Sequence, residues 1–329
     1  MSIKIIGTGS YTPEKILTNA DLEKIVETSN EWIVTRTGIQ ERRIAANDQA
    51  TSDLATKAAT NALDMAGINA EEIDLIIVAT VTPDRIFPST STILQSKIKA
   101  SNAACFDLQA ACTGFLYSLE CANSLMTNNP KYTKALIIGA EKLSVLTDWQ
   151  DRNTCVLFGD GAGAVVLEKR IDNNDIGGIL ASKLGSDGNY SEILKVPAGG
   201  SALSSSHDTI DQRLHYIRME GQEVFKLAVT AMSKACKDVM ASANVKPSQI
   251  RWLIPHQANL RIIKSVGNKL SISDEHVFVN LNKYGNTSAA SVVIALDEIV
   301  RSGKVERGDY LLFTAFGAGL TWGATLLRW

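Results

Sequence analysis

The stretch FDLQAACTGFLYSLECA at residues 106–122 joins a short apolar run to a longer apolar helical pattern through small residues. Cys112 lies in the small-residue segment AACTG (110–114), where the helix is predicted to begin. A helix N-terminus lowers the pKa of a thiol, and small neighbours let a substrate approach it. A buried structural cysteine also fits an apolar segment. The stretch therefore predicts a strand–turn–helix unit with Cys112 as a candidate nucleophile.

Units of this kind recur along the chain, because short β-branched runs alternate with Ala-rich helical patterns. This alternation is typical of an α/β fold with parallel or mixed sheets. The predicted strands are residues 3–7, 75–79, 104–108, 135–139, 164–167, 179–183, 252–255, 277–279 and 311–316. The predicted helices are residues 52–66, 113–126, 219–243, 260–270 and 288–301.

A weak internal repeat suggests that the chain is duplicated. AGINAEEIDLIIVAT, from residue 66, and ANVKPSQIRWLIPHQ, from residue 243, share a helix end, a polar turn and a strand at an offset of 177 residues. The same offset carries the Cys112 segment onto YGNTSAAS (284–291), another small-residue helix start. We therefore predict two similar halves, residues 1–170 and 171–329, that meet at IDNNDIGG (171–178). The Ser-rich PAGGSALSSSHD (197–208) predicts an exposed loop.

Composition excludes several classes of protein. The 329 residues exceed a typical single domain, and 45% hydrophobic with 21% charged residues is ordinary for a globular protein. A net charge of −2 without a long basic run argues against a nucleic-acid partner. Five cysteines without a CxxC pair favour neither a disulfide framework nor a zinc site. Without a signal-peptide core or an 18-residue apolar run, we expect a cytoplasmic protein with no membrane segment.

Three further segments carry candidate chemistry. Among four histidines, only His256 in WLIPHQANLR follows a predicted strand and precedes a helix, where catalytic groups of α/β sheets gather. Asn286 in NLNKYGNTSAAS stands at a Gly-Asn turn, and a helix cap also fits it. FTAFGAGLTWG (313–323) is a glycine-rich turn between apolar strands. It would form a tight hairpin or present N–H groups to an oxyanion.

Together these segments resemble the β-ketoacyl-[acyl-carrier-protein] synthase III family. The resemblance rests on QAACTGF, PHQAN, YGNTSAAS and FGAG, with TSNEWIVTRTGIQERR (28–43), TVTPDRIFPST (80–90) and LFGDGAGA (157–164) as further matches. It extends from residue 3 to Trp329. The family implies a thiolase fold, which is an α/β fold of duplicated βαβαβαββ halves in a five-layer αβαβα arrangement, and a homodimer.

The resemblance also implies a reaction, in which Cys112 takes an acyl group from a short acyl-CoA, with acetyl-CoA the expected primer. Malonyl-[acyl-carrier protein] then loses CO₂, and its carbanion attacks the thioester to give 3-oxoacyl-[acyl-carrier protein], which initiates fatty acid biosynthesis. His256 and Asn286 would stabilise the enolate, and the backbone N–H groups of Cys112 and Ala318 the other oxyanion. The chain would be an acyltransferase without cofactor or metal.

Ala318 departs from the family pattern, which commonly has glycine there. An N–H donor survives this change, but alanine tolerates positive φ poorly. We therefore expect the backbone of this turn or the width of the pocket to differ.

Substrate contacts are implied by the same resemblance. Thr28, Trp32, Arg36 and Arg152 would hold the nucleotide end of CoA, and Gly221, Phe225 and Asn259 would line the pantetheine tunnel. An aromatic ring with arginines suits a nucleotide, although Trp32 and Arg36 also fit a stacked surface pair and Phe225 also fits the core.

Carrier-protein docking is expected at the helix after His256, because the carrier is acidic in this family and this helix is basic. The residues expected to dock are Gln257, Ala258, Asn259, Leu260, Arg261 and Lys264. Arg261 and Lys264 also fit a solvated helix face. Phe87 would cross the dimer and close the acyl pocket of the partner, which favours short chains. Acetyl, propionyl and short branched primers stay open.

Related enzymes provide the alternatives. Thiolases use a second cysteine in the C-terminal glycine-rich turn, and AFGAGLTWG has none. Elongating ketosynthases use two histidines, whereas this chain offers His256 and Asn286. A 3-hydroxy-3-methylglutaryl-CoA synthase or a ketosynthase of specialised metabolism is a further alternative, and the latter could share the Cys-His-Asn set. A non-catalytic structural partner would have lost the nucleophile or the CoA residues, and both are present.

Overall fold

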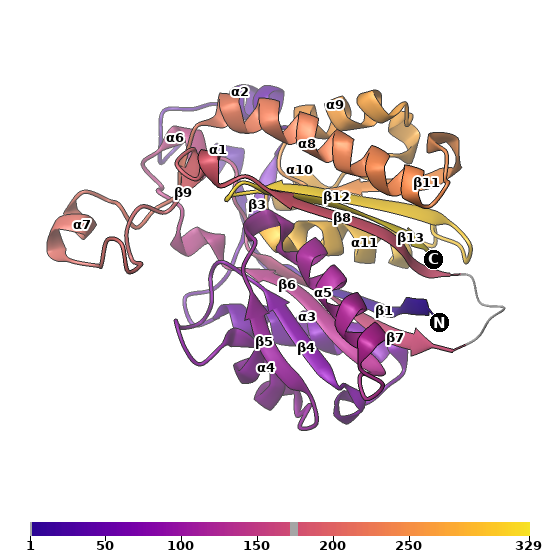
Figure 1. The fold of residues 1–329 in the computed structure, drawn as a ribbon. Coiled ribbons are helices and arrows are strands. Elements are labelled where there is room, and N and C mark those ends of the chain that lie inside the picture. The colour runs from indigo at the N-terminus through magenta and orange to yellow at the C-terminus, as the bar shows by residue number, and fades with distance from the viewer. Residues whose placement is uncertain (1, 172–176) are drawn as a thin grey trace.

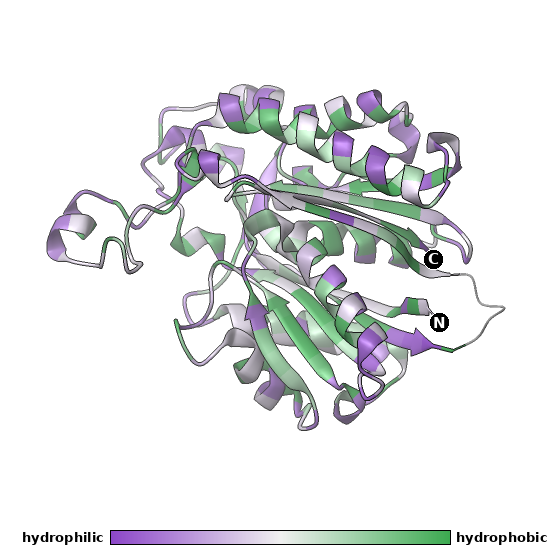
Figure 2. Ribbon diagram, in the orientation of Figure 1, coloured by the Kyte–Doolittle hydropathy of each residue, from purple (hydrophilic) through white to green (hydrophobic). Residues whose placement is uncertain are grey.

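The computed structural model describes residues 2–171 and 177–329. Its two larger sheets alternate with helices, so that helices lie outside each sheet and between them (Figure 1). This is the five-layer αβαβα arrangement that the family resemblance implied. β4 (Leu75–Ala79), in the first sheet, is strongly hydrophobic in Figure 2, because helices cover both faces of the sheet there.

The first sheet has five strands in the order β1-β7-β6-β4-β5. β4 pairs in parallel with β5 and β6, whereas β7 is antiparallel to both of its neighbours. β4 is buried along its whole length, which explains its continuous apolar run. The strands are β1 (Ser2–Tyr11), β4 (Leu75–Ala79), β5 (Ala104–Leu108), β6 (Lys134–Glu141) and β7 (Gly161–Arg170).

The second sheet has four strands in the order β11-β12-β13-β8. Read from β8, the order β8-β13-β12-β11 corresponds to β1-β7-β6-β4 of the first sheet, with the same parallel and antiparallel pairs. The strands are β8 (Gly178–Ser186), β11 (Ile250–Pro255), β12 (Tyr310–Gly317) and β13 (Thr321–Arg328).

Two helices, α5 (Gly114–Asn128) and α11 (Ser291–Arg301), lie between the sheets and contact both. Nearly all of α11 is buried, as expected for a helix packed on two sides. α3 (Thr51–Ala66) and α4 (Thr90–Ile98) cover the outer face of the first sheet. α8 (Gly221–Ser242) covers the outer face of the second sheet and packs against α9 (Leu260–Leu270).

Shorter elements surround this framework. The segment that carries α7 projects from the body (Figure 1), and residues 199–208 are exposed, which confirms the predicted loop. The shorter elements are β2 (Lys15–Thr18), α1 (Asn19–Leu22), α2 (Asn30–Thr37), β3 (Glu41–Ile44), α6 (Arg152–Cys155), β9 (Leu194–Lys195), α7 (His207–Asp211), β10 (Arg218–Met219) and α10 (Leu281–Tyr284).

One predicted strand, residues 277–279, is wrong. Only a single bridge joins Val277 to Leu253. The side chain of Gln257 replaces the neighbouring strand, because its Nε2 donates to the carbonyl of Phe278 at 3.1 Å and its Oε1 accepts from the amide of Asn280 at 3.0 Å. The second half therefore lacks the edge strand that β5 gives to the first, and the expected duplication is one strand short.

The remaining predicted strands and helices are confirmed, with ends that shift by up to four residues. The patterns missed α2, α4, β2 and β3, which are short or rich in Ser and Thr. The predicted crossing at 171–178 lies partly outside the described residues.

The offset of 177 residues recurs in the backbone geometry. α5 begins at residue 114 and α11 at residue 291. Each follows a single 3₁₀ turn, Ala111–Thr113 or Ser288–Ala290, whose first residue has a positive φ of 46° at Ala111 and 48° at Ser288. The repeat therefore places the same turn at the start of both buried helices.

Candidate active site

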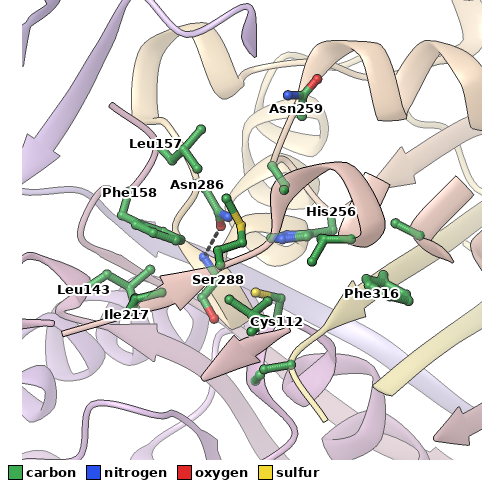
Figure 3. A pocket seen from close by; sticks show the side chains of 18 of the residues that line it. Cys112, Leu143, Leu157, Phe158, Ile217, His256, Asn259, Asn286, Ser288 and Phe316 are labelled. Carbon is green, nitrogen blue, oxygen red and sulfur yellow. Dashed lines mark hydrogen bonds between the residues drawn. The ribbon is translucent and has the colours of Figure 1, made fainter. Parts of the chain in front are cut away.

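The two turns contact each other beside a cavity of about 1310 Å³. Side chains from widely separated segments line this cavity, among them Cys112, His256 and Asn286 (Figure 3). Cys112 belongs to the turn before α5, His256 follows β11, and Asn286 precedes the turn before α11. The structure thus brings the three predicted reactive side chains together.

Cys112 is partly exposed and lines the cavity. Gly317 allows this turn to approach β12, because a Cβ at Gly317 would lie 2.7 Å from the amide nitrogen of Cys112. Burial of the thiol group raises the pKa of Cys112 to about 12, although a hydrogen bond with the Ser288 side chain lowers it. The expectation of a lowered pKa is therefore wrong for this state of the protein, because desolvation outweighs the stabilising hydrogen bond.

His256 is buried, and its amide donates to the carbonyl of Thr314 at 2.8 Å, which continues the pairing of β11 with β12. Its Nδ1 lies 2.6 Å from Oγ of Ser291. That oxygen accepts a bond from the amide of Gln257 at 3.3 Å, so the hydroxyl proton is available for Nδ1. Burial lowers the pKa of His256 to about 4. The ring is therefore neutral near pH 7, and this bonding gives Nε2 the proton.

Asn286 is held by its own backbone. Its amide donates to the carbonyl of Leu157 at 2.8 Å, and its carbonyl accepts from the amide of Gly159 at 3.0 Å. The side-chain Oδ1 accepts from the amide of Ser288 at 2.8 Å, which is the dashed line in Figure 3. Because Oδ1 is engaged, Nδ2 is the group left to act as a donor towards the cavity.

Ala318 also lines the cavity, in the turn that joins β12 to β13. Among the residues that the structure describes, Ala318 is not one of those with positive φ, whereas Gly319 has a φ of 139°. The expected strain from alanine is therefore absent, because the adjacent glycine adopts the left-handed conformation.

Trp32 lies close to two guanidinium groups. The centre of its ring is 5.0 Å from Cζ of Arg36 and 4.1 Å from Cζ of Arg152. Trp32 and Arg36 line the cavity. Thr28 is half-buried, and its Oγ1 has no hydrogen-bond partner. An aromatic ring with two cations next to a cavity can hold a nucleotide and its phosphates.

The predicted tunnel residues line the same cavity. Gly221 and Phe225 come from the start of α8, and Asn259 caps α9. Asn259 also donates through Nδ2 to the carbonyl of Arg36 at 3.0 Å, so it ties α9 to α2. Arg261 lies with its Cζ 5.5 Å from the ring centre of Phe225.

The residues predicted to dock the carrier protein differ in their surroundings. Ala258, Asn259 and Arg261 line the cavity, and Lys264 is exposed on α9. Gln257 is only 1% exposed, with a side chain that is fully engaged by backbone groups, so its assignment to a docking surface is wrong.

Two further predictions concern Leu260, expected to dock the carrier protein, and Phe87, expected to close the acyl pocket of a partner subunit. Leu260 is half-buried and belongs to the cluster beneath α2. Phe87 does not line the cavity of its own chain and is 82% exposed.

Several lining residues escaped the sequence analysis. Leu143, Phe158 and Ile217 form an apolar wall near Ser288 (Figure 3). They come from three distant segments, so no local pattern groups them. Ser288 itself could have been found through the offset from Ala111, although its contact with Cys112 could not.

The described residues contain no group of three or more His, Cys, Asp or Glu side chains arranged to hold a metal ion. None of the helices in residues 2–171 and 177–329 combines the length and apolar character needed to cross a membrane.

All five cysteines are free thiols, and Cys155 is buried away from the cavity lining.

Comparisons with known proteins give the family of the chain. Residues 106–188 match the family 3-oxoacyl-[acyl-carrier-protein (ACP)] synthase III, and residues 240–329 match its C-terminal domain. The chain is 54% identical over 99% of its length to a β-ketoacyl-[acyl-carrier-protein] synthase III of Caldanaerobacter subterraneus, of which 97% is covered.

Solved structures with a similar fold include members of the same family. The 3-oxoacyl-[acyl-carrier-protein] synthase III of Aquifex aeolicus superposes with a TM-score of 0.91 at 51% identity, covering 99% of this chain and all of that one. The priming β-ketosynthase of the R1128 polyketide pathway superposes with a TM-score of 0.90 at 34% identity, covering 99% and 96%. The resemblance in sequence and the thiolase fold are thus confirmed, and the chain belongs to the 3-oxoacyl-[acyl-carrier-protein] synthase III family of condensing acyltransferases.

Proposed function

We propose that this chain condenses a short acyl-CoA, with acetyl-CoA as the first choice, with malonyl-[acyl-carrier protein]. The products are 3-oxoacyl-[acyl-carrier protein], CoA and CO₂, and the reaction initiates fatty acid biosynthesis. One observation carries the assignment of roles: Cys112, His256 and Asn286 line one cavity next to Trp32 and Arg36. Family membership supports the reaction, and the geometry supports the residues.

In the first half-reaction the sulfur of Cys112 attacks the carbonyl carbon of the acyl-CoA, and CoA leaves. The covalent thioester divides one difficult transfer into two easier ones. The backbone N–H groups of Cys112 and Ala318 would bind the oxyanion of this step. Gly317 supports that role, because only a residue without Cβ lets β12 come this close to Cys112.

In the second half-reaction the malonyl group loses CO₂ and the remaining carbanion attacks the thioester on Cys112. Nε2 of His256 and Nδ2 of Asn286 would donate to the enolate oxygen. Both groups are neutral donors fixed by Ser291 or Ser288, so they need no reorganisation. A fixed donor of this kind contributes roughly 3 kcal/mol to the transition state.

The nucleotide end of CoA would stack on Trp32 and pair with Arg36 and Arg152, with Thr28 as a further partner. Gly221, Phe225 and Asn259 would line the pantetheine path to Cys112. Since CoA thioesters are substrates and the reaction involves no redox change, no cofactor and no metal is proposed.

The proposed assembly is a cytoplasmic homodimer without nucleic-acid or membrane partners. Each subunit would consist of two halves, residues 1–170 and 171–329, because the first sheet ends at Arg170 and the second begins at Gly178. Phe87 of one subunit would close the acyl pocket of the other, which agrees with its exposure in the single chain. The carrier protein would dock near Ala258, Arg261 and Lys264.

Priming in specialised metabolism is the second candidate, because a polyketide priming enzyme shares the fold at 34% identity. The identity of 54% to a β-ketoacyl-[acyl-carrier-protein] synthase III favours fatty acid synthesis. Activity with the fatty-acid carrier protein but not with a polyketide carrier protein supports the first candidate, and the reverse preference supports the second.

The direct test is intact-mass and peptide mass spectrometry after treatment with acetyl-CoA. We expect one acetyl group per chain on Cys112, and none on Cys112→Ala protein that still binds CoA. The matched control is Cys155→Ala, which removes a buried thiol outside the cavity lining and should keep the adduct. An acyl-enzyme formed by Cys112→Ala would contradict the assignment.

A further inference from the structure

Ser291 is the first residue of α11, and its side chain reaches the end of β11. Its Oγ lies 2.6 Å from Nδ1 of His256 and accepts from the amide of Gln257 at 3.3 Å. Ser291 and His256 are both buried, with 2% and 5% of their surface exposed. Ser291 is not among the described residues that line the cavity, whereas His256 is. Any effect of Ser291 on the reaction would therefore pass through His256.

The hydrogen bonds of Ser291 assign the proton of the His256 ring. The amide of Gln257 can only donate, so Oγ of Ser291 accepts there. The Ser291 hydroxyl still has one proton to give, and Nδ1 is the acceptor that the structure shows within reach of it. With a proton on Nδ1 instead, the buried hydroxyl would lack an acceptor among the described residues, which is costly. The contact thus favours the tautomer that carries its proton on Nε2.

The choice between the two tautomers of His256 matters because the ring is neutral near pH 7. Burial lowers the pKa of His256 to about 4. A neutral imidazole has one N–H group, and its other nitrogen carries a lone pair. Only the Nε2–H tautomer offers a donor to the enolate, because Nδ1 faces Ser291. In the other tautomer a lone pair would face the developing negative charge and repel it.

The first half of the chain lacks this polar pair at the matching positions. The offset of 177 residues carries His256 onto Ala79 at the end of β4, and Ser291 onto Gly114 at the start of α5. A Cβ at Gly114 would lie 2.9 Å from Cβ of Ala79, so these two positions are neighbours as well. The contact between a strand end and a buried helix thus uses two small residues in one half and a hydrogen bond in the other. Packing by itself therefore requires neither the histidine nor the serine.

We propose that Ser291 is a positioning residue that holds the His256 ring with its proton on Nε2, in the orientation that presents this proton to the enolate. The inference rests on the proposed function, because the enolate role of His256 is proposed there. Ser291 also ties His256 to α11, and the turn before this helix binds the side chain of Asn286 through the amide of Ser288. One helix therefore fixes the positions of both proposed donors relative to each other.

The direct test is ¹⁵N NMR of the imidazole rings in protein labelled at its four histidines. The signals of His256 are those missing from His256→Gln. In the wild-type protein we expect the His256 proton on Nε2, and in Ser291→Ala a mixture of both tautomers. Ser291→Thr keeps the hydroxyl and should restore the Nε2–H form. A serine that served packing alone would leave the tautomer unchanged.

Kinetics of the same variants separate positioning from binding. Ser291→Ala should slow malonyl decarboxylation roughly tenfold, the low end of the effect of losing a partner that orients a metal-bound histidine. The KM for malonyl-[acyl-carrier protein] and the acylation of Cys112 should change little, because Ser291 lies outside the cavity lining. Ser291→Thr should recover most of the rate.

The matched control is Ser233→Ala in α8. Ser233 is another buried helical serine, but its Oγ donates to the carbonyl of Val229 in its own helix at 2.7 Å. Its variant should keep both the tautomer and the rate. An unchanged tautomer in Ser291→Ala, or an equal loss of rate in Ser233→Ala, would overturn the proposal. A changed tautomer with normal decarboxylation would instead contradict the donor role of His256 in the proposed function.

Discussion

The turns before α5 and α11 share a backbone but carry different chemistry. Ala111 and Ser288 open them with nearly equal positive φ values of 46° and 48°. The next residue is Cys112 in the first turn and Ala289 in the second. In the second turn, Ser288 instead contacts the thiol and orients Asn286. Duplication therefore gave both turns the same backbone geometry. The first turn carries the nucleophile, and the second carries side chains that surround it.

Each turn is also supported by the sheet of the opposite half. A Cβ at Gly317 of β12 would lie 2.7 Å from the amide nitrogen of Cys112. A Cβ at Gly139 of β6 would lie 2.3 Å from the carbonyl oxygen of Ala289. The first half thus supports the second turn, and the second half supports the first turn. Neither half can position its own reactive residue alone.

The largest expected effect separates the nucleophile of the first turn from the two donors, His256 and Asn286, that line the same cavity. His256→Ala or Asn286→Ala should lower malonyl decarboxylation by about a hundredfold or more, as for a lost oxyanion donor. Acylation of Cys112 should survive in part, because neither side chain contributes the nucleophile. The two half-reactions are followed by release of labelled CO₂ and by mass spectrometry of the acyl-enzyme. Normal decarboxylation with damaged loading would contradict the division of roles.

The next effect tests the crossed support by glycine. Gly317→Ala should impair loading of Cys112, because the added methyl group pushes on that turn. Gly139→Ala should impair decarboxylation, because it pushes on the turn that carries Ser288. Each should also lower the free energy of unfolding by about 1–3 kcal/mol, as overpacking does.

The matched control for this pair is Gly188→Ala, since a Cβ there would contact nothing within 4 Å. It should leave both half-reactions unchanged. Equal loss of both half-reactions in both glycine variants would show that the turns move together.

The smallest effect concerns the rim of the cavity. Lys264→Glu should raise the apparent KM for malonyl-[acyl-carrier protein] severalfold and weaken its salt dependence, because rim charges act on association. Loading from acyl-CoA should stay unchanged. Arg261→Glu is less clean, because Arg261 also packs on Phe225 in the cavity wall. The control is Lys269→Glu in the last turn of the same helix. An equal loss with malonyl-CoA as extender would place docking elsewhere.

The sequence by itself determined the α/β class, most elements and the residues that carry the motifs. Hydrophobic periodicity and helix-start signals are local properties, so β4 and α9 could be predicted with correct bounds. The repeat predicted that α5 and α11 begin at corresponding positions of the two halves. Duplication preserves this spacing even where residue identities are lost.

Only the tertiary structure decided what surrounds those residues. It buried Gln257 in place of an edge strand and raised the pKa of Cys112 where a local rule predicted a lower one. Desolvation and hydrogen bonding depend on which distant segments pack together, and no spacing along the chain encodes that. The motifs identified the reactive residues, and the packing of the two halves sets the protonation states of Cys112 and His256.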